Sequence, residues 1–156
     1  MNNPDIYKML YDRAYADTGT GGLFSNQMGE SALVTGWFSA LAPTNQTFPY
    51  CVASIASKTP EDGFAVDLLR VRWRVSVFSL VRNGLASPSG VLRRIYGDWS
   101  ASGSQTYGFH RWLPSMTSSD GWAASAMRFI SEFEQHDEDV YQHGQEYEFY
   151  LSRTNP

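Results

Sequence analysis

The sequence has little of what marks a secreted, membrane or nucleic-acid-binding protein. Its single cysteine, Cys51, cannot form an internal disulfide, which is typical of proteins made in a reducing compartment. No uninterrupted apolar run approaches the roughly 20 residues of a membrane span. The first residues, MNNPDIYK, lack the charged start and apolar core of a secretion signal. The formal net charge of −4 argues against a general nucleic-acid binder, and we expect no membrane partner.

Sequence signatures of catalysis are also absent. The glycine-rich TGTGG at 18–22 follows a predicted helix and lacks the Lys-Ser/Thr of a phosphate-binding loop. No G-x-S-x-G motif is present. Cys51 lies in an apolar run, and His110 has no acid or nucleophile nearby in the sequence, so structural roles are favoured for both. We therefore expect no enzymatic activity and no cofactor.

The chain does contain the apolar material of a folded domain. Hydrophobic residues make up 42% of it and aromatic residues 15%, against 18% charged residues, a balance unlike that of disordered chains. A chain of 156 residues can bury about two thirds of its unfolded surface. We expect one domain over residues 1–156.

The clearest pattern is the alternation along Arg70–Val81, RVRWRVSVFSLV. Successive side chains of a strand point to opposite faces, so this segment predicts a half-buried strand of roughly 36–40 Å. One face is apolar and carries Val71, Trp73, Val75, Val77 and Val81. The other face carries Arg70, Arg72, Arg74 and Ser76, and its three arginines need partners.

The last segment predicts a hairpin that supplies those partners. A turn at 137–139 would place Phe129 opposite Tyr147 and Arg128 opposite Glu148, uniting the apolar residues of both strands on one face. Keeping odd-numbered residues opposite odd-numbered ones is required, because a slip of one residue flips a face. The other face would then present four acids to neutralise the arginines: Glu132, Glu134, Glu146 and Glu148. An ordinary solvated face with compensated charges is the alternative to a contact surface.

Other segments complete the expected order. Asn3-Pro4 predicts the capped start of a helix over 4–16, and Ser87-Pro88 that of a second helix ending near Trp99. Further strands are expected at 32–38, with Trp37 inward, at 48–57 and at 107–113, with a turn at 59–63. The fold class is therefore α+β: a largely antiparallel β-sheet with two α-helices packed on one face and a C-terminal β-hairpin.

Two other functions remain open at this point. The first is a metal-binding site or small enzyme at His136, Asp137, Asp139 and His143; the spacing matches no known motif, and the two histidines are expected on opposite strand faces. No metal ligands are therefore assigned. The second is phosphate binding by Arg70, Arg72 and Arg74, which the expected neighbouring acids and the negative total charge disfavour.

Several segments, in this order, are similar to a known family. They are the capped helix PDIYKMLYDRAYAD, the strand FPYCVASIAS, the run RVRWRVSVFSLVRNG leading into SPSGVLRRIYGDW, and the closing AMRFISEFEQHDEDVYQHGQEYEFYL. With these, the chain resembles the tail completion or tail terminator proteins of long-tailed bacteriophages from Asn3 to Ser152. The resemblance implies an α+β domain without enzymatic activity or cofactor.

The same resemblance implies a role in assembly. Such proteins form a ring, usually six-fold, on the end of the tail tube, where they stop tube growth and join the head connector. The implied partners are further copies of the chain, the tail tube protein and a head-completion or connector protein, with DNA at most passing through the lumen. The implied location is the head–tail junction of the virion, after assembly in the bacterial host cytoplasm. Another neck protein, a head-completion or stopper component, is the alternative. As interface or lumen residues we predict Arg70, Arg72, Arg74, Glu132, Glu134, Glu146 and Glu148.

Overall fold

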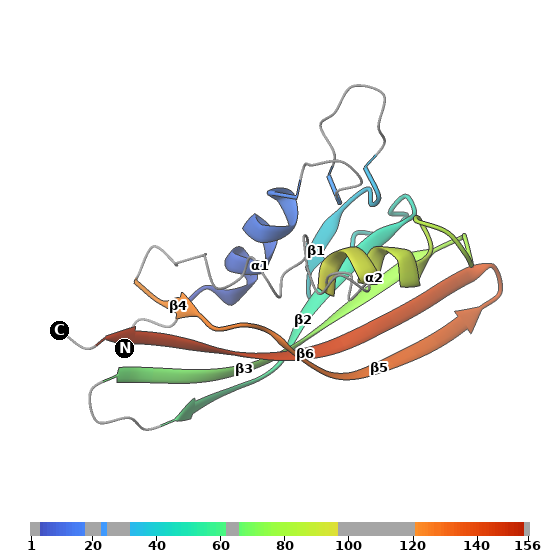
Figure 1. Ribbon diagram of the computed structural model, residues 1–156. Coiled ribbons are helices and arrows are strands. Elements are labelled where there is room, and N and C mark those ends of the chain that lie inside the picture. The colour runs from blue at the N-terminus through green and yellow to red at the C-terminus, as the bar shows by residue number, and fades with distance from the viewer. Residues whose placement is uncertain (1–3, 18–22, 25–31, 62–65, 97–120, 155–156) are drawn as a thin grey trace, which may run out of the picture.

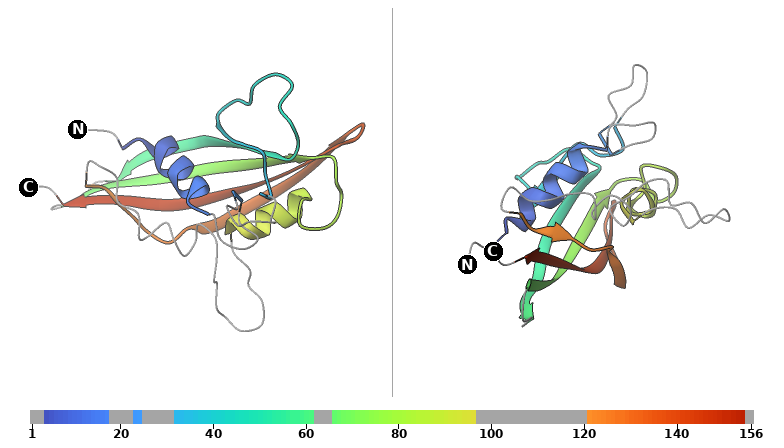
Figure 2. Two further views of the ribbon diagram at one scale, coloured as in Figure 1. Left: turned by 90° about the horizontal axis from the view of Figure 1, so that it is seen from above. Right: turned by 60° about the vertical axis from the view of Figure 1, so that its left-hand side comes forward.

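One curved sheet with two helices forms the part of the chain that the computed structural model describes, residues 4–17, 23–24, 32–61, 66–96 and 121–154 (Figure 1). The strands are arranged β1-β2-β3-β6-β4, and β5 also pairs with β6. All of these pairs are antiparallel except β1 with β2. Both helices lie on the same side of the sheet (Figures 1 and 2). The predicted α+β class is confirmed. The elements are α1 (Ile6–Tyr15), β1 (Trp37–Ser39), β2 (Tyr50–Glu61), β3 (Val66–Ser79), α2 (Pro88–Tyr96), β4 (Ala123–Ala124), β5 (Arg128–Asp137) and β6 (Val140–Thr154).

The boundaries of several elements differ from the prediction. Helix α1 is capped by Asp5, whose carboxylate accepts a hydrogen bond from the Lys8 amide at 3.0 Å. Strand β2 continues through the predicted turn at 59–63 as far as Glu61. It can hold Pro60 because β1 pairs only with Cys51–Ala53, which leaves the rest of β2 at an edge of the sheet. The predicted strand at 107–113 and the end of the second predicted helix lie outside the described residues.

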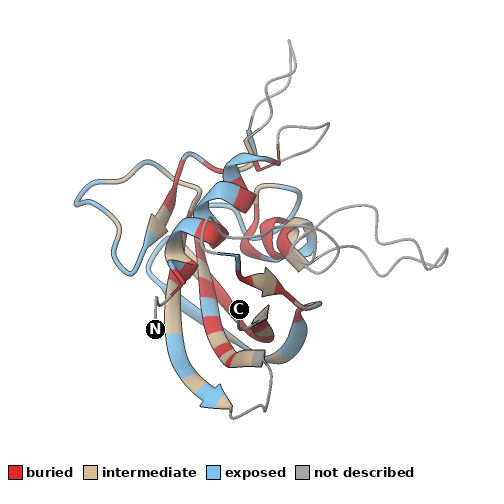
Figure 3. Ribbon diagram, turned by 90° about the vertical axis from the view of Figure 1, so that its left-hand side faces the viewer, coloured by how far each residue is buried: buried red, intermediate tan, exposed pale blue. Residues whose placement is uncertain are grey.

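The apolar side of β3 forms the centre of the core, as predicted. Four of its side chains are completely buried, and they face the buried β6 residues Tyr147, Phe149 and Leu151 under the two helices (Figure 3). The Tyr147 ring lies between Trp73, at 5.2 Å, and Tyr96 of α2, which stacks on it at 5.4 Å. The completely buried β3 residues are Val71, Trp73, Val75 and Val77. Val81 lies beyond the end of β3 and is 47% exposed, contrary to the prediction.

The β5–β6 hairpin combines two registers. Phe129 lies opposite Tyr147 and Arg128 opposite Glu148, as predicted. The turn, however, contains only two residues, so Asp137 pairs with Val140 and every pair near the tip joins an odd-numbered with an even-numbered residue. A bulge between Phe129 and Ser131 absorbs the extra residue. The predicted uniform register is therefore wrong between the bulge and the tip.

The bulge changes which side chains reach which face. Beyond it, Phe133 lies opposite Gly144 and its ring covers this glycine on the face away from the helices, 5.2 Å from the Arg74 guanidinium. Glu134 lies opposite His143 and shares the helix-covered face with it. We call the surface turned away from both helices the outer sheet face.

Candidate functional site

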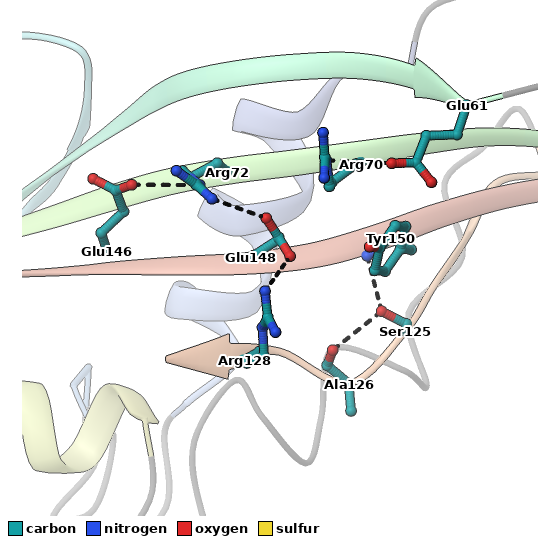
Figure 4. A network of polar contacts seen from close by, with 9 residues as sticks. All are labelled: Glu61, Arg70, Arg72, Ser125, Ala126, Arg128, Glu146, Glu148 and Tyr150. Carbon is teal, nitrogen blue, oxygen red and sulfur yellow. Dashed lines mark hydrogen bonds and ion pairs between the residues drawn. The ribbon is translucent and has the colours of Figure 1, made fainter. Parts of the chain in front are cut away.

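A network of arginines and carboxylates occupies the middle of the outer sheet face (Figure 4). Strand β3 places alternate arginines there, and the antiparallel pairing sets Arg72 opposite Glu148 and Arg74 opposite Glu146. Arg72 lies 3.3 Å from Glu148 and 3.5 Å from Glu146, and Arg74 lies 2.9 Å from Glu146. Arg128 of β5 reaches Glu148 from the other side at 2.8 Å. The predicted neutralisation of the arginines is confirmed for Glu146 and Glu148.

Arg70 has a different partner from those predicted. Its Nε atom lies 3.3 Å from an oxygen of Glu61, at the end of β2. Glu61 was not among the predicted site residues. The TPEDG sequence around it is typical of a turn, so the prediction ended the strand before this residue. The alternation of Thr59 and Glu61 with their neighbours was the signal that could have found it.

The carboxylates of the network are buried, whereas its arginine side chains are largely exposed. The Glu148 side chain is 4% exposed, whereas those of Arg72 and Arg128 are 41% and 71% exposed. A carboxylate removed from water is costly unless cations and hydrogen bonds compensate it. The arginines therefore hold the acids within the sheet surface, and the solvent meets mainly guanidinium groups. The outer sheet face is cationic although the whole chain is acidic.

A groove of about 440 Å³ continues the outer sheet face beyond Arg74. Its walls are mostly apolar and aromatic: the Tyr50 and Phe78 rings stack at 5.0 Å across β2 and β3, and Phe133 lies on the β5 side. Leu41, in the connection from β1 to β2, lines the groove and is 82% exposed. Burial raises the pKa of the Tyr50 hydroxyl, so this ring stays neutral near pH 7. The groove therefore combines one cation, Arg74, with aromatic rings and the polar side chains of Ser76 and Gln142.

Glu132 and Glu134 lie elsewhere, contrary to the prediction that they neutralise the arginines. The bulge turns both toward His143, whose ring nitrogens lie 3.3 Å from Glu132 and 3.6 Å from Glu134. The Ser89 hydroxyl of α2 lies 3.1 Å from Nδ1 of the same ring. His143 is 8% exposed and lines a second groove of about 510 Å³, together with Arg82. This cluster connects α2 to the hairpin.

The hypothesis of a metal site at the hairpin gains no support. His136 stacks on Tyr141 at 4.6 Å, and the register near the tip puts it on the same face as His143, not on the opposite face as predicted. Among the described residues, no group of three or more histidine, cysteine or acidic side chains is arranged to hold a metal ion. Within the same residues, no helix is both long and apolar enough to cross a membrane.

Comparison with known proteins identifies a similar fold. A chain in the structure titled "Virion of native gene transfer agent (GTA) particle" superimposes with a TM-score of 0.55, over 94% of this chain and 94% of that chain. The two sequences are 12% identical, so the likeness concerns the fold. No family model matches the sequence, and no curated protein matches it.

Proposed function

We propose that the protein is a structural component of a phage-like virion, a tail terminator whose copies form a ring on the end of the tail tube. The observation that carries this proposal is the shared fold with a chain of a gene transfer agent virion over 94% of both chains. Because the similarity extends over nearly the whole length, it supports a single domain over residues 1–156. It also supports a structural role in a virion for this chain. The resemblance of the segment order to tail terminator proteins supports the finer assignment.

The surface of the molecule suits a subunit of an assembly. Among the described elements, both helices lie on one face of the sheet and none covers the outer sheet face, which suits contacts with neighbours (Figures 1 and 2). Large apolar side chains are exposed in the connections that flank β2 and β3, namely Leu41, Leu80 and Leu85. Exposed apolar groups and an uncovered sheet face favour contacts with other subunits. Head-to-tail contacts between different surfaces close into a ring when the rotation allows, here a hexamer in our proposal.

The proposed role is one of joining, without catalysis or a cofactor. The ring would stop growth of the tube by contact with the tail tube protein, and would bind a head-completion or connector protein on its other side. Assembly would take place in the bacterial cytoplasm, and the finished location would be the head–tail junction of the virion. The net charge of −4 of each chain suits a ring whose lumen DNA passes through, because negative charges repel the DNA phosphates.

Sedimentation and imaging test this function. The purified chain should form a discrete oligomer, alone or on isolated tail tubes, in sedimentation velocity and native mass spectrometry over a range of concentrations. Electron microscopy of assembled particles should place the subunit between tube and connector. A strict monomer under every condition, tail tubes included, would refute the ring. A ring found elsewhere in the neck would instead indicate a head-completion or stopper component.

A further inference from the structure

The β5–β6 hairpin is acidic along its length from the bulge to the tip. Glu132 and Glu134 have side chains that are 57% and 77% exposed, and Asp137, Glu138 and Asp139 are exposed at the turn. In the described part of the chain, none of these five acids forms an ion pair with a lysine or an arginine. We call residues 132–139 the acidic hairpin. Glu132 and Glu134 contact His143, whereas the three acids of the turn form no ion pair within the described residues, so the charge of the turn is available to a partner.

The shape of the tip suits insertion into a groove. The turn consists of two residues, and Glu138 has a φ of 50°, the left-handed conformation that tight hairpin turns require. The hairpin extends past the neighbouring strands, and its tip projects from one end of the molecule (Figure 2, left). A narrow, anionic projection of this kind needs a cationic recess as its complement.

The outer sheet face contains such a recess. Arg74 stands at the border of the 440 Å³ groove, and its side chain is 48% exposed although it also binds Glu146. Arg72 and Arg128 continue the row of exposed guanidinium groups away from the groove.

Phe133 of the acidic hairpin lines this groove within its own chain, but Glu132, Glu134 and the three acids of the turn are not among the lining residues. Glu134 shares the helix-covered face with His143, whereas Arg74 lies on the outer sheet face of the same sheet. Two complementary surfaces at different places on one subunit allow a head-to-tail contact between copies. We propose that the acidic hairpin of one copy docks into the Arg74 groove of the next copy. This inference rests on the proposed self-assembly and specifies its interface.

Cysteine cross-linking tests the contact without disturbing the fold. Leu41 at the groove and Glu138 at the tip are both exposed, and the native Cys51 is completely buried. In the variant Leu41→Cys/Glu138→Cys, mild oxidation should give a ladder of disulfide-linked oligomers. The matched control Leu41→Cys/Asp12→Cys, with its second cysteine on the exposed side of α1, should give at least tenfold less. Equal cross-linking in the two variants would overturn the proposal.

Charge reversal gives an independent test. Half-assembly of Glu138→Lys should require a protein concentration at least ten times that of the wild type. Asp12→Lys, with the same change in charge, should change the concentration at half-assembly less than twofold. Adding Arg74→Glu to Glu138→Lys should restore assembly at least in part. Circular dichroism of each variant shows whether it is folded.

The outcomes separate this interface from the proposed function. A wild-type ring that neither cross-links at these positions nor responds to Glu138→Lys refutes the docking and leaves the ring intact. A wild-type chain that never assembles refutes both. Salt-sensitive binding of a short DNA duplex to the wild type, lost in Arg74→Glu while assembly persists, would assign the arginines to phosphate and overturn the docking.

Discussion

Replacing Gly144 by alanine should force Phe133 off the sheet. A Cβ atom at Gly144 would lie 2.0, 2.3 and 2.8 Å from three carbons of the Phe133 ring, far inside van der Waals contact. Strand β6 cannot shift to relieve the clash, because at Gly144 it is paired with β3 on one side and with β5 on the other. The ring on the outer sheet face is only partly buried, so it is the group that must move.

The magnitude follows from what the ring loses. Leaving Gly144 gives up cross-strand packing of roughly 0.2–1 kcal/mol and the contact with Arg74, 5.2 Å away, worth about 0.5–1 kcal/mol. Residual crowding adds to this, since overpacking costs about 1–3 kcal/mol. The smaller entropy of alanine in the unfolded chain offsets about 0.4–1 kcal/mol. We expect a net destabilisation of about 1–4 kcal/mol, or roughly 2–16 °C in Tm for a domain of this size.

A double-mutant cycle isolates this clash. Urea denaturation followed by tryptophan fluorescence should give the free energy of unfolding for the wild type, Gly144→Ala, Phe133→Ala and the double variant. With Phe133 truncated, Gly144→Ala should cost nothing or stabilise slightly, giving a coupling energy of at least about 1 kcal/mol between the two sites. An equal cost of Gly144→Ala in both backgrounds would show that the ring does not cover this glycine.

Three further changes have defined outcomes. Replacing Arg72 and Arg128 by alanine leaves the buried Glu148 carboxylate without a cation and should cost about 3–5 kcal/mol in urea denaturation. Glu148→Gln should cost less, roughly 1–2 kcal/mol, because Arg72 keeps Glu146 and the exposed Arg128 is the group that loses its carboxylate. The reverse order would contradict this account. Burial raises the pKa of the Cys51 thiol in the folded chain, so the thiol of the unfolded chain ionises first, above about pH 8.5. The free energy of unfolding should therefore fall by up to about 1.4 kcal/mol per pH unit above that pH. Cys51→Ala should remove this contribution, and an unchanged slope of stability against pH in the variant would exclude the thiol as its source. Deleting Ile130 removes the extra residue of the bulge and joins the Phe129–Tyr147 and Ser131–Glu146 pairs in one continuous register, so the hairpin should keep its pairing and the Tm should stay within about 4 °C of the wild type by thermal denaturation; a loss of more than about 2 kcal/mol would show that the bulge itself is required.

Much of the fold could be predicted because its signals are local. The alternation around Trp73 follows from the period of two in a strand, so the buried and exposed sides of β3 were both correct. Ser87 was correctly predicted to cap α2: the Gly90 amide donates to its hydroxyl at 3.1 Å. The pairing of Phe129 with Tyr147 followed from uniting apolar residues on one face, a requirement that the sequence displays directly.

The errors in the hairpin arose because the pairing of β5 with β6 depends on the length of the turn between them. The turn after Asp137 contains two residues without the Asn-Gly or Asp-Gly signal that marks such turns, so its length could not be read from composition. One residue of difference in that turn reverses the faces of Glu132 and Glu134 and moves them from the arginines to His143.

The sequence alone determined that the arginines would lie on one side of β3 and that Trp73 and its neighbouring valines would be buried on the other, because side-chain direction along a strand is set within the strand. Which carboxylate meets which arginine was settled by the folded molecule. Partner choice depends on register, and register here is a compromise between a short turn at one end of the hairpin and apolar packing at the other, reconciled by the bulge at Ile130. That compromise left Glu146 and Glu148 buried under guanidinium groups and turned Glu132 and Glu134 toward His143.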